Sequence, residues 1–391
     1  MATSSRIRVA PKVIRWARLT AGMDVETAAS RMGVRAERVS EWEAGDKDPT
    51  IKQLRTMSDV YDRPLATLFM GEPPDGSDRR SLPDFRRPAV RETTTPRALQ
   101  KAVMRAYRQQ DALRDNAAEL RLTSKDTNAA FTLNLSTNAQ ITGARLRDFL
   151  RIKSITKSTL IQPDIFLREL VRRAEDLNVT VMQVQRVPVA EMRGFSLGRG
   201  SSPIVALNGA DWPRGKVYTL LHELAHVGFR TDGLCDLQQV EEAQLERRCD
   251  EVAAAALMPA EGLSALAHPS PPEPPTLRLC RAVGNEYGAS GEAALLRLID
   301  LNLATWDDYR RLKPEFDAAY TAYKSDEKDR NAGKDSPIFY QVKARDLGRR
   351  FIQQMLAAYG EEALSSRDLA QLLEVPYDKV PKLAGLVGQD F

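Results

Sequence analysis

The chain has 391 residues, of which 42% are hydrophobic, and its formal net charge at pH 7 is only +4. This length predicts two or three domains with substantial cores, and so small a net charge does not by itself indicate a nucleic-acid-binding protein. We expect a cytoplasmic protein, because no apolar run approaches the about 20 residues of a membrane span, no secretion signal is recognisable, and three cysteines make no disulfide framework.

Residues 1–70 read as a bundle of five short helices. Breaks at Gly22, Gly33 and Gly45 end the first three, and two more follow in TIKQLRTMSDVYD and PLATLFM. A helix, a tight turn at Gly33 and a second helix together have the geometry of a helix-turn-helix motif. The segment therefore predicts a small all-helical domain with a helix-turn-helix at its centre.

This segment resembles the helix-turn-helix domains of the Xre (Cro/C1-type) family over about 60 residues. The matching features are small residues in the first motif helix, a glycine turn and the pattern S-x-W-E-x-G, carried here by Ala28, Ala29, Gly33, Ser40, Trp42, Glu43 and Gly45. The resemblance implies that the second motif helix, about 35 to 44, enters the major groove of double-stranded operator DNA. It also implies that Trp42 packs in the core.

Four residues of this domain are expected to face DNA, namely Thr27, Arg35, Arg38 and Ser40. Because such domains commonly read two half-sites as dimers, we also expect a homodimer. The alternative is a protein-binding module, since Glu37, Glu41 and Glu43 lie on the same helix and weaken its attraction for phosphates.

Between this domain and residue 162 the sequence is less regular. Residues 71–96 are rich in Pro, Gly and Arg, which is the composition of a linker. A long amphipathic helix is predicted over 97–122, and the stretch to about 160 carries no decisive pattern. From 163 a helix in PDIFLRELVRRAEDLN precedes three candidate strands in VTVMQVQRV, MRGFSL and PIVALN.

The next helix contains the stretch TLLHELAHVGF, with two of the three histidines in the chain. His222 and His226 are four residues apart and so lie on one helix face, where both rings can reach one metal ion. Glu223 lies one position further round, as in the H-E-x-x-H helices of metallohydrolases, where this glutamate is the general base. The alternative is that the two histidines are four residues apart by chance and bind no metal ion.

A catalytic zinc site needs a third protein ligand. The helix QQVEEAQLERRCDEVAAAALM, closed by Pro259, offers five carboxylates, namely Glu241, Glu242, Glu246, Asp250 and Glu251. Glu246 falls on or beside the apolar side of this helix, where an unpaired carboxylate is costly. Asp250, four residues on, is placed to accept the N–H of a ligating histidine.

HELAH followed by ERRCDEVAAAALMP resembles the ImmA/IrrE family of zinc metallopeptidases, which pairs H-E-x-x-H with a downstream E-x-x-[AC]-[ND] helix. The resemblance is good over about 165 to 265. It implies that His222, His226 and Glu246 bind zinc and that Glu223 takes the proton of the zinc-activated water.

The sequence does not decide which residue would donate a hydrogen bond to the oxyanion of the reaction. Tyr218 is the first candidate, because it lies one helical turn before His222, and Arg230 and His268 are the others. A ligand role is not expected for Cys235 or for Cys249, which is predicted to pack as a small apolar residue.

After a Pro-rich break at 266–276, helices are predicted at 276–288, 290–301, 305–325, 343–359, 366–373 and 376–388. The fold class is therefore mainly α with a small α+β domain, which by the resemblance is zincin-like. The expected parts are 1–70 (helix-turn-helix), 71–96 (linker), 97–162 (connecting helical region), 163–265 (metallopeptidase-like domain) and 266–391 (helical C-terminal region).

Together the two resemblances imply a DNA-binding transcriptional regulator whose zinc peptidase cleaves a repressor-type protein or its own chain, with residues 71–96 as an accessible target. An antitoxin is the alternative. It would bind and neutralise a neighbouring toxin, autoregulate its operon, and use the peptidase fold mainly as a binding surface. A transcription factor with a purely structural zinc is a third possibility.

Overall fold

The structure is a computed structural model, and it describes residues 6–21, 23–61, 63, 65–73, 97–116, 131–231, 239–267, 274–331 and 339–389. The chain divides into two compact units, Met1–Met104 and Arg105–Phe391. Most of the expected linker lies outside the described residues. Within the described ranges, every helix is too short or too polar to cross a lipid bilayer.

The N-terminal unit contains the five predicted helical elements. They are α1 (Pro11–Thr20), α2 (Val25–Met32), α3 (Ala36–Ala44), α4 (Ile51–Tyr61) and the 3₁₀ helix η1 (Leu65–Phe69). Asp24 caps α2 by accepting a hydrogen bond from the Thr27 backbone N–H at 2.6 Å. Gly33 ends α2 in the left-handed conformation, with φ of 65°, as the tight turn requires. The core of this unit includes Trp42, as expected.

The second unit is built around a three-stranded sheet with the order β1-β3-β2. The strands are β1 (Thr180–Val184), β2 (Gly194–Leu197) and β3 (Ile204–Asn208), which confirms the three predicted strands. β1 runs parallel to β3, with Thr180 opposite Ile204, and β2 runs antiparallel to β3, with Gly194 opposite Leu207. The short strand β2 is therefore an edge of the sheet.

Helices make up the rest of the described second unit. In chain order up to residue 257, these helices are α5 (Arg97–Asp115), α6 (Ala139–Phe149), η3 (Ile152–Ser154), α7 (Lys157–Leu160), α8 (Pro163–Asp176), α9 (Pro213–Gly228) and α10 (Gln239–Leu257). The first residues of α5 belong to the N-terminal unit. The segment without a decisive sequence pattern thus contains α6, η3 and α7, while residues 117–130 lie outside the described ranges.

The C-terminal region is helical, as predicted. Its elements are α11 (Ala260–Ala267), α12 (Leu277–Tyr287), α13 (Gly291–Asp300), α14 (Trp306–Asn331), α15 (Phe339–Leu347), α16 (Arg349–Gly360), α17 (Ser366–Leu372), η4 (Tyr377–Lys379) and α18 (Val380–Val387). Helix α11 continues to Ala267, two residues into the stretch where a Pro-rich break was expected.

The prediction of a single helix over 343–359 was wrong. The chain forms α15 and α16, separated by Gly348 with φ of 86°. A Cβ at Gly348 would lie 2.6 Å from the Val181 carbonyl oxygen on β1. The close approach to the sheet and the left-handed backbone both require glycine here, and they interrupt a pattern that looks continuous in sequence.

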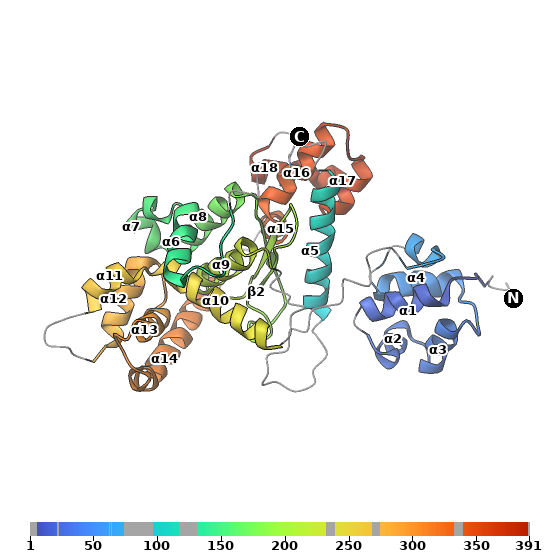
Figure 1. Cartoon of the computed structure of the whole chain (residues 1–391). Coiled ribbons are helices and arrows are strands. Elements are labelled where there is room, and N and C mark those ends of the chain that lie inside the picture. The colour runs from blue at the N-terminus through green and yellow to red at the C-terminus, as the bar shows by residue number, and fades with distance from the viewer. Residues whose placement is uncertain are drawn as a thin grey trace. The chain divides into compact units, whose positions relative to one another are not determined.

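Helices α9 and α10 occupy the centre of the second unit (Figure 1). Helix α9 packs on β2 and β3, while α10 packs on both α9 and α6. One apolar cluster joins these elements and includes Leu220, Leu224 and Val227 from α9 and Val252 and Ala256 from α10. The two helices that carry the candidate metal-binding residues are therefore held by the main core.

The approach of α6 to α10 depends on one glycine. A Cβ at Gly143 would lie 2.6 Å from Ala255 Cβ, 2.8 Å from Ala256 N and 2.9 Å from Val252 O, two of which are backbone atoms. G143A should therefore push α6 away from α10 and lower the free energy of unfolding by about 1–3 kcal/mol, as measured by chemical denaturation.

The matched control is G385A. Gly385 lies inside α18, where a Cβ would meet none of the described atoms within 4 Å. Alanine favours the helix there, so G385A should keep or slightly raise stability. Equal losses in the two variants would contradict the proposed close packing of α6 on α10.

Candidate metal centre and DNA-binding face

Helix α9 places two imidazoles in the interior of the second unit. Pro213 occupies its first turn, where the missing N–H costs nothing, and a largely apolar sequence buries most of its length. The side chain of His226 is 1% exposed and that of His222 is 13% exposed. Buried imidazoles need polar partners, since an unpaired polar group in the core is costly.

The Nε2 atoms of both rings converge on Glu246 of α10. His222 Nε2 lies 3.2 Å from Glu246 Oε2, and His226 Nε2 lies 3.1 Å from Glu246 Oε1. The two Nε2 atoms are 3.2 Å apart. One ligand atom from each of the three residues falls within 4.8 Å of the others, so this group could hold a metal ion. Among the α10 carboxylates whose side chains the structure describes, Glu246 belongs to this group, whereas Asp250 and Glu251 do not.

The opposite ring nitrogens have oxygen partners. His222 Nδ1 lies 2.9 Å from Asp250 Oδ1, and His226 Nδ1 lies 3.2 Å from Thr231 Oγ1. The Thr231 hydroxyl donates to the His226 carbonyl at 3.2 Å, so its oxygen accepts from Nδ1–H. Such bonds fix the tautomer with the proton on Nδ1 and leave the Nε2 lone pair for a metal ion.

When Nε2 also carries a proton, the two imidazole rings form charge-assisted hydrogen bonds with Glu246. Burial by itself lowers the pKa of His222, but hydrogen bonds to Asp250 and Glu246 outweigh it and raise that pKa to about 10. Burial likewise opposes ionisation of Glu246, yet hydrogen bonds from the two histidines hold its pKa well below the usual range. The Glu246 side chain is 43% exposed, so the group is open to solvent on the α10 side.

Glu223 is buried between this group and β2, and the charges of His222, His226 and Glu246 all act on its carboxyl. A Cβ at Gly194 would lie 3.3 Å from Glu223 Cγ and 2.4 Å from Thr219 Cγ2, so a glycine on β2 lets α9 approach the strand. Glu223 is 5% exposed, and its Oε2 has no hydrogen-bond partner among the described residues. Burial raises the pKa of its carboxyl, against the charges of His222 and His226 and the Ser196 hydroxyl.

The hydroxyl of Tyr218 is directed at Asp250. It donates to the Asp250 carbonyl oxygen at 3.2 Å and to Oδ1 at 3.3 Å. This places Tyr218 behind the partner of His222, as a support for Asp250, and its role as an oxyanion donor stays a prediction. Arg230 donates to Thr132 Oγ1 at 3.4 Å. Cys249 packs in the apolar core, while Cys235 and His268 lie outside the described residues.

Thr231 was missed by the sequence analysis. It follows Arg230, which has φ of 60°, immediately after the end of α9. A threonine in a helix-ending turn carries no distinctive pattern, so only the fold shows that its hydroxyl meets His226.

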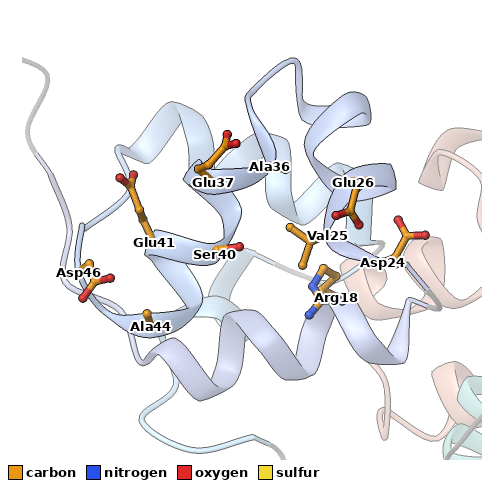
Figure 2. A pocket seen from close by; sticks show the side chains of 10 residues that line it. All are labelled: Arg18, Asp24, Val25, Glu26, Ala36, Glu37, Ser40, Glu41, Ala44 and Asp46. Atoms are coloured by element: carbon orange, nitrogen blue, oxygen red, sulfur yellow. The ribbon is translucent and has the colours of Figure 1, made fainter.

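Helices α2 and α3 border an open groove of about 750 Å³ in the N-terminal unit, and Ser40 is the DNA-facing candidate that lines it (Figure 2). Ser40 is exposed and lines the groove, and Arg35 is exposed at the N-cap of α3. Arg38 is only partly exposed and lies 3.4 Å from Glu41. Thr27 is half-buried in the first turn of α2 and is not among the residues that line the groove.

The hydroxyl of Thr231 is expected to support metal binding through its hydrogen bond with His226. A metal ion held by His222, His226 and Glu246 should bind about tenfold or more weakly in T231V, because His226 loses the acceptor that orients it. Competition with a chelator measures the affinity. The control is T142V, which removes another buried hydroxyl, bonded to the Asn138 carbonyl on α6. If both variants bind metal like wild type, Thr231 does not orient His226.

Family comparisons agree with both halves of the structure. Residues 174–298 match the model of the IrrE N-terminal-like domain of peptidase family M78, and residues 14–68 match a helix-turn-helix model. No curated protein matches the chain. The first match spans the sheet and the α9–α10 pair, and the second spans α1 to η1 apart from the ends. The chain therefore joins a helix-turn-helix domain of the Xre type to a peptidase domain of the ImmA/IrrE family.

Proposed function

We propose that this regulator is a zinc metallopeptidase that cleaves a repressor-type protein or its own chain and thereby changes transcription at an operator. The observation that carries the proposal is the convergence of two imidazole Nε2 atoms and a carboxylate, with both Nδ1 atoms already bonded. Two nitrogens, one carboxylate and an open side form a donor set suited to catalytic zinc.

Different residues would bind the metal ion, transfer the proton and orient the two imidazole rings. His222, His226 and Glu246 would hold zinc, which supplies Lewis acidity toward the scissile carbonyl and lowers the pKa of water. Glu223 takes the proton of the attacking water and returns it to the leaving amine. Asp250 and Thr231 keep the two rings in orientation, and Tyr218 supports Asp250.

The substrate is proposed from the organisation of the chain. A DNA-binding domain and a peptidase-like domain share one polypeptide. Residues 71–96 between them have a Pro-, Gly- and Arg-rich composition with few large apolar residues, which proteases readily accept. Cleavage there, in cis or in trans, would separate the DNA-binding domain from the rest of the protein.

Metal analysis tests the ligand set. Purified wild-type protein should hold about one zinc ion per chain. H222A and E246A should lose it, because each removes one of three ligands. E251Q is the control, because Glu251 lies on the same helix but pairs with Arg248 at 3.1 Å. Retention of zinc by E246A would contradict the assigned site.

A cleavage assay tests the reaction. Zinc-loaded protein is incubated alone and with the products of neighbouring genes, and fragments are identified by mass spectrometry. E223Q should keep its zinc but cleave at least about 100-fold more slowly, since it lacks the general base. If wild type and E223Q leave every protein intact but both bind a neighbouring gene product, the peptidase proposal fails and the antitoxin alternative is supported.

DNA binding is proposed for α3, with Arg35 as its main cationic contact and a homodimer reading two half-sites. R35A should weaken operator binding at least about fivefold. R38A should cost less, because Arg38 is already near Glu41. Titration of labelled duplexes measures both affinities, and light scattering measures the oligomeric state. A larger loss in R38A than in R35A would contradict this assignment.

A further inference from the structure

Five residues of α3 line the groove of the N-terminal unit, and they lie on one face of the helix. They are Ala36, Glu37, Ser40, Glu41 and Ala44, in which Ser40 and Glu41 lie three and four residues after Glu37 (Figure 2). In the helix-turn-helix arrangement the residues toward the start of this helix reach the base edges. Glu37, at the second position of α3, is therefore among the residues nearest the bases. This step rests on the proposed DNA binding.

The other carboxylates of α3 have cationic partners within the unit. Glu41 bonds Lys47 at 2.7 Å and lies 3.4 Å from Arg38. Glu43 holds Arg18 through two hydrogen bonds, of 2.6 and 2.8 Å. Glu37 differs from both, because it is exposed and forms no ion pair with any described residue. Its charge is thus available to a ligand in the groove.

Few groups in the major groove can form a favourable contact with an unpaired carboxylate. It repels phosphates, and it only accepts hydrogen bonds, so it must meet a donor. The base-edge donors are the amino groups of cytosine and adenine. Adenine also presents its N7 acceptor beside the amino group, which repels the second carboxylate oxygen. Cytosine lacks this acceptor.

We propose that Glu37 is a specificity-determining residue that accepts a hydrogen bond from the N4 amino group of a cytosine in each half-site. The arginine at the helix start supplies attraction, and Glu37 selects sequence.

Selection from a pool of random DNA duplexes by the full-length protein tests this proposal. The wild-type consensus should fix one cytosine per half-site, with at least about fivefold preference over each other base. In E37Q the cytosine preference should disappear and adenine should be favoured there, because an amide both donates to adenine N7 and accepts from its amino group.

D46N is the matched control, because Asp46 is an exposed acid at the other end of α3 that lines the same groove. It removes the same charge, so it should raise affinity for all duplexes about equally and keep the preference for cytosine. A consensus that E37Q leaves unchanged, or that D46N changes equally, overturns the role of Glu37. If folded wild-type protein retains no duplex from the pool, the proposed DNA binding itself fails. If it retains duplexes without a consensus, Glu37 reads no base and this inference alone fails.

Discussion

The packing of α9 against α10 is the contact on which the candidate metal centre depends. The apolar faces of these helices bury Leu220, Leu224 and Val252 in a single cluster, and this burial fixes the distance between the helices. It also brings Glu246 of α10 close to the two histidines of α9, which are polar residues in a largely apolar interface. Burial of hydrocarbon supplies the free energy that holds three polar ligands together.

The two histidines are stable in this interface because each has a partner. Nδ1 of His222 meets Asp250 and Nδ1 of His226 meets Thr231, while both Nε2 atoms face Glu246. These bonds satisfy the rings in the interior and orient them for a metal ion at the same time. The same groups therefore serve the stability of the core and the proposed chemistry.

Close approaches at glycines set the surroundings of the site. Gly143 lets α6 approach the small-residue stretch of α10, and Gly194 lets α9 approach β2. Helix α10 therefore packs on both α6 and α9, and α9 in turn packs on β2. Glu223 is enclosed against β2, which gives it a buried environment distinct from that of the neighbouring His222.

In the N-terminal unit, acidic residues line the groove and a basic residue lies beside it. Of the carboxylates of α3 that line the groove, Glu41 is paired with Lys47, whereas Glu37 forms no ion pair with any described residue. Phosphate attraction must then come from residues beside the groove, such as Arg35. Affinity and sequence selection are thereby assigned to different residues of one short helix.

Local patterns in the sequence were sufficient for much of the fold. The helical period places His222 and His226 on one face wherever that helix lies, and the turn at Gly33 follows from the backbone freedom of glycine. The three strands and most helices were likewise predicted, because their apolar spacing is a property of each segment alone. The resemblance to two families, confirmed by comparison, added their order along the chain.

Tertiary structure decided which distant residues meet. The apolar pattern of α10 only favoured Glu246 among five carboxylates, whereas packing on α9 brings its oxygens within 3.2 Å of both imidazoles. Thr231 and the contact of Tyr218 with Asp250 had no local signal, and the break at Gly348 depends on a carbonyl of β1. Each depends on how separate segments pack against one another, and the spacing of residues within one segment does not encode that.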